Sequence, residues 1–147
     1  MAETSGFFDA VYDEFKKEYD LEYVAEQFAN YFSMFIKNGV FGSPTNQLRV
    51  ASGDGMTVVI MEGNAFISGY WYNNNEELSL SISSNTGSSD RTDSIILRLD
   101  HSERKISALY MEDSTDVIRT DTYYDLKLAE ITVHSGASQI SDSDIKD

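Results

Sequence analysis

The sequence of 147 residues contains no cysteine and only one proline, Pro44. The absence of cysteine excludes disulfide cross-links, thiolate metal sites and cysteine nucleophiles. Basic residues are also scarce, because 11 lysines and arginines stand against 25 aspartates and glutamates and give a formal net charge of −14. Binding to nucleic acid or to an anionic membrane surface needs clustered basic side chains, so we expect neither.

Long apolar segments are missing as well. No run approaches the roughly 20 apolar residues that span a bilayer. The N-terminal sequence MAETSGFFDAVYDEF has neither the basic nor the apolar region of a signal peptide. We therefore expect a soluble protein without membrane insertion. It would be made in the cytoplasm and would leave the cell by lysis or by a route other than general secretion.

The apolar content that is present suffices for a hydrophobic core, since 41% of the residues are hydrophobic and 12% are aromatic. A chain of this length is expected to form a single domain over residues 1–147. With such a core, the domain should fold without a metal or other cofactor.

The clearest pattern is an alternation of apolar and polar residues between Asp93 and Met111, interrupted by the polar turn 101–104. Alternation across a short turn predicts an antiparallel hairpin with one face in a core. Similar segments predict seven strands, at roughly 47–51, 55–62, 64–73, 77–83, 93–100, 104–112 and 124–134. The spacing predicts a mainly β fold, an antiparallel β-sandwich or partly open barrel with one N-terminal α-helix packed on it.

Turn and bulge positions follow from local chemistry. The segments 52–55 and 62–64 contain glycine beside aspartate or asparagine, so tight turns are expected there. In the last strand, two leucines and two later β-branched residues have opposite phases. A β-bulge near Ala129–Glu130 would bring all four side chains to the core: Leu126, Leu128, Ile131 and Val133.

The single predicted helix covers about residues 20–38, with Asp20 as its N-cap and Asn38–Gly39 as its C-terminal stop. Its apolar side chains follow three- and four-residue spacings and form one stripe: Val24, Phe28, Tyr31, Phe32, Phe35 and Ile36. Since the sequence offers no second helix, the stripe must pack on the sheet or on a neighbouring subunit. The two alternatives are equally favoured.

Catalytic and metal-binding patterns are weak. Neither His101 nor His134 lies in a recognisable motif with a serine or a carboxylate, so both are expected at the surface. The acidic segment with Glu112, Asp113, Asp116, Asp121 and Asp125 lacks the spacing of a calcium loop, and a solvated loop is favoured. A charge-assisted pair of Arg91 and Asp93 is expected to hold the start of a strand, with Arg98 and Asp100 on a solvent face.

Three consecutive aromatic residues, Tyr70, Trp71 and Tyr72, form a candidate sugar contact, because aromatic faces stack on the apolar faces of pyranose rings. In a strand, however, the two tyrosines share one face and Trp71 takes the other, so at least one face is expected in the core. A saccharide ligand and a purely structural role are both retained.

Several segments together resemble the N-terminal region of tail-tip and baseplate proteins from siphophages and prophages of Gram-positive bacteria, the upper-baseplate and receptor-binding group. The segments are GFFDAV at 6–11, FANYFSMFIKNGVF at 28–41, LRVASGDGMTVVIMEGNAFISGYWYNN at 48–74, DRTDSIILRLDHSERKI at 90–106, and YDLKLAEITVHSGASQISDSDIKD at 124–147. The ordered patterns within them are NGVF, G-x-A-x-I-x-G-Y-x-Y, R-x-D-x-I-x-L-R-L-D, and L-A-x-I-x-V followed by G-A.

This resemblance implies a virion structural protein of the tail tip or baseplate, synthesised in the cytoplasm of a bacterial host. Such a segment joins the particle and carries a host-recognition domain, so the chain would be the N-terminal part of a longer protein. The family implies a homo-oligomer, often a trimer, with other baseplate proteins as partners, no catalytic residue and no cofactor. The expected interface residues are Phe7, Phe8, Phe28, Tyr31, Phe32 and Phe35.

Overall fold

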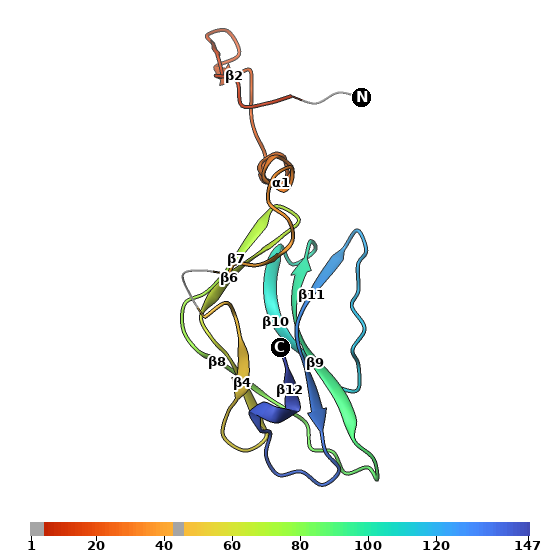
Figure 1. The fold of residues 1–147 in the computed structure, drawn as a ribbon. Coiled ribbons are helices and arrows are strands. Elements are labelled where there is room, and N and C mark those ends of the chain that lie inside the picture. The colour runs from red at the N-terminus through yellow and green to blue at the C-terminus, as the bar shows by residue number, and fades with distance from the viewer. Residues whose placement is uncertain (1–4, 43–45) are drawn as a thin grey trace.

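The computed structural model describes residues 5–42 and 46–147, so Pro44 lies outside the described residues. In this part of the chain the protein is mainly β, with one α-helix, one 3-10 turn and twelve strands in four antiparallel sheets (Figure 1). The strands are β1 Tyr12–Asp13, β2 Glu18–Tyr19, β3 Gly39–Val40, β4 Val50–Ser52, β5 Thr57–Ile60, β6 Gly63–Ile67, β7 Tyr70–Asn74, β8 Leu78–Ser81, β9 Arg91–Asp100, β10 Lys105–Met111, β11 Tyr123–Val133 and β12 Ile145–Lys146. The helix is α1 Ala25–Ser33, and the 3-10 turn is η1 Asp142–Asp144.

The largest sheet has the order β10-β9-β11-β12 and contains the predicted hairpin. In that hairpin Lys105 pairs with Asp100 and Met111 pairs with Ser94, so the predicted antiparallel hairpin is confirmed. A β-bulge in β11 is also confirmed, but it lies one residue earlier than predicted. Lys127 and Ala129 face consecutive residues of β9, and Leu128 between them has no partner in the register. The bulge restores the phase of the strand, and its apolar side chains all pack in or against the core.

We call strands β3–β12 the β body. Its remaining strands form two three-stranded sheets, with orders β3-β6-β7 and β4-β5-β8. A single sandwich of seven strands is therefore not confirmed. The predicted strand 64–73 is in fact two strands joined by a two-residue turn at Ser68–Gly69, where Ile67 pairs with Tyr70. Both turn residues have positive φ, +51° and +86°, as a type I′ hairpin requires.

The turn predicted at 62–64 is wrong, because Gly63 lies inside β6 and pairs with Asn74. A side chain at Gly63 would meet the backbone nitrogen of Leu48, so glycine is needed there for close approach of two chain segments rather than for chain reversal. Strand β5 continues through a kink into β6 without turning back.

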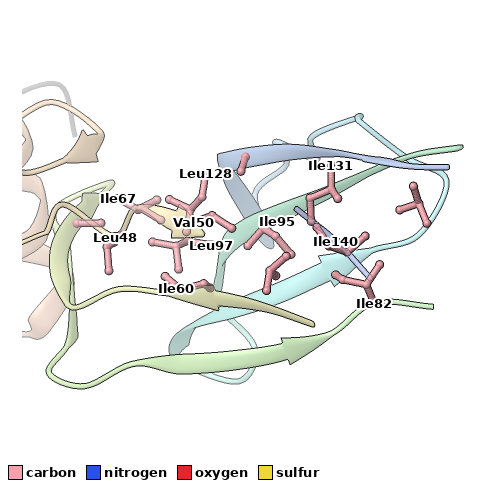
Figure 2. Close-up of a cluster of buried hydrophobic side chains, with 14 of the residues drawn as sticks. Leu48, Val50, Ile60, Ile67, Ile82, Ile95, Leu97, Leu128, Ile131 and Ile140 are labelled. Atoms are coloured by element: carbon pink, nitrogen blue, oxygen red, sulfur yellow. The ribbon is translucent and has the colours of Figure 1, made fainter. Parts of the chain in front are cut away.

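Three sheets share one hydrophobic core. Figure 2 shows side chains from the β4–β6 region meeting those of β9 and β11. Its fully buried members include Ile60, Ile67, Ile95, Leu97 and Ile131, each with an exposed fraction of 0%. Burial of such a side chain stabilises the folded state by about 1.5–3 kcal/mol.

The outer face of the large sheet is also covered, which the sequence pattern did not predict. Ser94, Ile96 and Asp125 are fully buried although they face away from the main core. The segment between β10 and β11 lies against them, because the Ser94 hydroxyl donates to the Ser114 carbonyl (2.7 Å) and the Ile118 amide donates to Asp125 Oδ2 (2.9 Å). The loop 112–122 thus covers the outer face of this sheet.

Helix α1 is shorter than predicted, with nine residues instead of about nineteen. Asp20 is not its N-cap. The Asp20 carboxylate instead accepts the Val11 amide (2.7 Å) and closes the small hairpin β1–β2, while the helix starts after Val24, whose amide donates to Gln27 Oε1 (2.9 Å). The predicted stop at Asn38–Gly39 is also wrong, because Gly39 pairs with Phe66 as part of β3.

The N-terminal part of the chain projects beyond the β body. Figure 1 shows α1 above the β6–β7 turn and the β1–β2 hairpin farther out, away from the sheets. Within α1 only Ala29 is buried. The predicted packing of this helix on the sheets is therefore limited to contacts with the β6–β7 hairpin.

Candidate functional site

Exposed apolar side chains are concentrated at one end of the described chain. Of its 16 exposed large hydrophobic residues, 14 lie between positions 7 and 41, and the other two are Trp71 and Ile118. Single exposed apolar residues are normal on protein surfaces, whereas a contiguous group marks an interaction site. The candidate interaction surfaces are therefore the N-terminal segment and the surroundings of Trp71.

Six aromatic rings form what we call the N-terminal aromatic surface: Phe7, Tyr23, Phe28, Tyr31, Phe32 and Phe35. Phe7 is at its centre, with its ring stacked on that of Phe28 (4.9 Å between centroids) and edge-on to that of Tyr31 (4.8 Å). Tyr31 continues the row to Phe35 (5.1 Å). These rings contact one another rather than the core, and the exposed fraction of Phe35 is still 59%.

The structure thus brings together five of the six predicted interface residues. The sixth, Phe8, is 64% exposed, and among the described residues its ring contacts no other ring. Sequence reasoning missed Tyr23, whose hydroxyl accepts the Phe8 amide (2.8 Å) and whose ring lies 5.2 Å from that of Phe7. Tyr23 directly precedes the predicted stripe, so its aromatic character was the available signal.

The aromatic surface is joined to the body at a narrow point. The backbone of Ala29 packs so closely on Gly69 that a Cβ at Gly69 would overlap the Ala29 carbonyl. The Phe32 ring lies edge-on to that of Phe66 (6.4 Å), and Asn38 Oδ1 accepts the Ser68 amide (2.7 Å). The β6–β7 turn is thus the place where the helix packs on the rest of the protein, and we call it the helix seat.

The three consecutive aromatic residues of β7 alternate as predicted. Tyr70 and Tyr72 are half-buried against the core, and burial raises the pKa of the Tyr72 hydroxyl. Trp71 faces outward with an exposed fraction of 75%. Only Trp71 therefore has a ring face free to stack on a ligand.

Trp71 borders a cleft of about 440 Å³, which we call the Trp71 cleft; its polar and aromatic lining consists of Tyr70, Trp71, Asp100, His101, Arg104 and Lys105. The cleft lies between β7 and the turn that joins β9 to β10. The His101 ring stands edge-on to that of Tyr70 (5.7 Å). The Asp100 carboxylate accepts the amides of Ser102 and Glu103 at 2.9 and 3.0 Å and so is committed to the turn.

The predicted pair of Arg91 and Asp93 is confirmed, with Nε and Oδ1 separated by 2.8 Å. Tyr110 donates its hydroxyl hydrogen to Asp93 Oδ2 (2.6 Å), and the Asp113 amide donates to Oδ1 (2.8 Å). Burial alone would raise the pKa of Asp93, but Arg91, Tyr110 and the amide together hold it below its ordinary value. Desolvation and this carboxylate raise the pKa of Tyr110. The cluster is internally satisfied and structural.

Arg98 and Asp125 form a second pair, which the sequence did not predict. The guanidinium binds the carboxylate at two points, Nε to Oδ1 at 2.7 Å and Nη2 to Oδ2 at 2.8 Å. Arg98 is therefore not a simple solvent-face residue, and Asp125 is not part of the solvated acidic loop. Burial acts to raise the pKa of Asp125, but the bonds from Arg98 and the Ile118 amide lower it overall.

Both histidines lie at the surface, as predicted. His134 contacts two carboxylates, with Nδ1 2.8 Å from Asp90 Oδ2 and Nε2 3.1 Å from Asp144 Oδ1, and these raise its pKa. Over residues 5–42 and 46–147 no group of three or more His, Cys, Asp or Glu side chains is arranged to hold a metal ion.

No family model matches the chain, and no curated protein or solved structure is significantly similar to it. In the described segments no helix has the length and apolar composition needed to cross a membrane.

Proposed function

We propose that this protein is a structural module of a phage or prophage tail tip or baseplate, which attaches a host-recognition domain to the particle and has no catalytic role. The N-terminal aromatic surface would be the contact to further copies of the chain, in a homo-oligomer such as a trimer, and to neighbouring baseplate proteins. The body would act as a β-sandwich spacer, with the four-stranded sheet on one side of the core and the two three-stranded sheets on the other.

One observation supports this proposal most strongly, the location of the exposed apolar residues. They occupy a projecting segment in which the Phe7 ring contacts those of Phe28 and Tyr31, and all three side chains remain about 40% exposed. The burial of such rings on association drives assembly, and aromatic residues are enriched in interfaces. The module thus combines a β region that has its own hydrophobic core with an N-terminal segment whose apolar side chains remain exposed. The resemblance to baseplate proteins agrees with this arrangement.

The proposal can be tested by placing charge on the aromatic surface. Tyr31→Glu with Phe35→Glu alters two half-exposed side chains outside the main core, so the β body should stay folded. We expect light scattering to show that the native chain is oligomeric and that the double variant is a monomer with an unchanged strand signal in circular dichroism.

Ile118→Lys, which alters an exposed apolar residue outside the segment 7–41, is the matched control and should remain oligomeric. A native chain that stays monomeric at high concentration, or a double variant that unfolds, would contradict the proposed interface.

The role in a particle needs a separate measurement. The protein should be found in tail particles purified from an induced lysate, and its intact mass there should exceed the 16.5 kDa of the present chain if it carries a further recognition domain. Absence from purified particles would refute the tail-tip role.

A second candidate function is saccharide binding at the Trp71 cleft. The observation that favours it is the 75% exposed indole beside a cleft with polar lining, since ligand sites combine apolar platforms with a few polar groups. A Trp71→Ala variant should lose binding of cell-wall oligosaccharide, whereas Phe15→Ala, which removes a ring that is 99% exposed and lies outside the cleft, should not. No binding by the native chain would exclude this candidate.

A further inference from the structure

The Trp71 cleft has an electrostatic character opposite to that of the chain as a whole. The chain has a formal net charge of −14, yet the side chains that line the cleft include two cations, Arg104 and Lys105. The one carboxylate in the lining, that of Asp100, is engaged by two backbone amides. An anionic group in the cleft would therefore meet cationic donors rather than the acidic surface.

Arg104 is the most available of these donors. It is exposed, and among the described residues it forms no ion pair, whereas Arg91 and Arg98 are both bound to carboxylates. Lys105 lies 3.9 Å from Glu103, a long and exposed pair that a stronger partner could replace. A guanidinium presents a planar fork of donors that matches phosphate or carboxylate oxygens at two points.

The backbone of the turn also holds Arg104 in an uncommon conformation, one of seven such non-glycine positions in the described residues. Its φ is +53°, in the left-handed region that bulky L-residues rarely adopt, at the position where β9 turns into β10. Glycine or asparagine would occupy this conformation with less strain. Strained positions cluster at binding sites, where the surrounding structure maintains them for the placement of a side chain.

We propose that the Trp71 cleft binds an anionic saccharide, with the indole of Trp71 stacked on the apolar face of the sugar ring and Arg104 bound to a phosphate or carboxylate substituent. This inference rests on the second candidate function and specifies its ligand class. The cleft volume of about 440 Å³ lies within the range of small-ligand sites.

The protein offers a direct readout, because Trp71 is its only tryptophan. The indole fluorescence of the full chain would be titrated with glucose 6-phosphate, glucuronic acid, glucose and inorganic phosphate. We expect saturable changes with the two anionic sugars, at a dissociation constant about tenfold lower than that for glucose, since a hydrogen bond to a charged group contributes enough for such a ratio. The relative affinities for the phosphate and carboxylate sugars identify the preferred anion.

Variants separate the two parts of the site. Arg104→Gln should abolish the preference for anionic sugars and leave binding of glucose unchanged, whereas Arg104→Lys should retain part of it. Lys16→Gln, which removes an exposed lysine from the N-terminal hairpin, is the charge-matched control and should bind like the native chain. High salt should weaken anionic sugar binding selectively.

The outcomes distinguish the proposals. Equal affinity for glucose and glucose 6-phosphate would overturn the anionic preference and leave saccharide binding standing. An equal response to inorganic phosphate alone would show an anion site without a sugar platform and overturn the inference. No response to any sugar would overturn both the inference and the second candidate function. None of these three results tests the oligomerisation proposed for the N-terminal aromatic surface.

Discussion

The pair of Arg98 and Asp125 gives the sharpest test of how the large sheet is stabilised. Asp125 has an exposed side-chain fraction of 0% and accepts three hydrogen bonds, two from Arg98 and one from the Ile118 amide of the covering loop. Asp125→Asn preserves the size of the side chain and its ability to accept the Ile118 bond. It removes the negative charge and leaves the Arg98 guanidinium, which is 18% exposed, without its counter-ion.

The magnitude follows from the burial of the pair. Removal of one partner from a buried pair costs about 3–5 kcal/mol, and the partial exposure of Arg98 places the expected loss near the lower value. An unfolding entropy of about 2.1 cal/mol/K per residue corresponds to about 0.3 kcal/mol/K for this chain. The variant should therefore have a free energy of unfolding about 3 kcal/mol lower and a Tm about 10 °C lower.

Urea unfolding followed by circular dichroism would measure the effect. Lys127→Gln is the matched control on the same strand, because it disrupts a 2.7 Å pair with Glu130 whose two side chains are each 32% exposed, and it should cost less than about 1 kcal/mol. Combining Asp125→Asn with Arg98→Met removes the stranded charge, so the double variant should be more stable than the single one. A single variant within about 1 kcal/mol of the native chain would refute the reasoning.

The same pair has a consequence for acid stability. The pKa of Asp125 is lowered in the folded protein, so its contribution is present above the unfolded value of about 3.9 and is lost as the pH falls through the folded value. The free energy of unfolding of the native chain should thus decrease as the pH falls below about 4. That of the Asp125→Asn variant should decrease less over the same pH range.

Two further predictions concern the helix seat and the C-terminal region. Gly69→Ala should separate α1 from the body, because the new Cβ would overlap the Ala29 carbonyl and the residue has a φ of +86°. Proteolysis should then cleave the N-terminal segment faster, while the urea midpoint of the core changes little. An unchanged rate of proteolysis would contradict this. The raised pKa of His134 means that its contacts with Asp90 and Asp144 stabilise the fold fully below the unfolded pKa of about 6.5 and lose their effect as the pH rises through the folded value. The urea midpoint should therefore decrease in the native chain as the pH rises from about 6.5, and a His134→Gln variant that kept the same slope would refute this assignment.

The strands could be predicted because their signals are local. Alternation over two residues determined the β9–β10 hairpin, and the phase change in β11 revealed a bulge that the structure places at Leu128. The pair of Arg91 and Asp93 was accessible for the same reason, since its members are two residues apart on one strand face.

The features that were missed depend on contacts distant in sequence. Arg98 and Asp125 are 27 residues apart, and only the fold brings them together. Gly63 was assigned to a turn because glycine serves both chain reversal and close packing, and the choice depends on Leu48, which lies in the segment before β4. Asp20 was taken as a helix cap, whereas the distant Val11 amide claims its carboxylate.

The helix boundaries were wrong for a reason that also bears on function. A stripe of aromatic residues at helical spacing predicts burial, and a helix of nine residues has little stability of its own. In the structure the rings instead contact the segment that precedes the β1–β2 hairpin, which we call the arm. Phe7 of this arm lies against Phe28 and Tyr31 at a φ of +66° that a bulky residue rarely adopts. The arm and the helix therefore support each other through surfaces that remain half-exposed.

That arrangement couples order to association. The β body is stabilised by its own core, whereas the segment 7–41 has only Ala29 buried among its helical residues and contacts the body mainly at the β6–β7 turn. Any partner that covers the rings removes apolar area from water and at the same time fixes the arm against the helix, so both gains favour the bound state. The Trp71 cleft includes Ala25 of α1 in its wall and lies next to this seat. The two candidate surfaces thus meet at one point of the fold, where α1 packs on the β6–β7 hairpin.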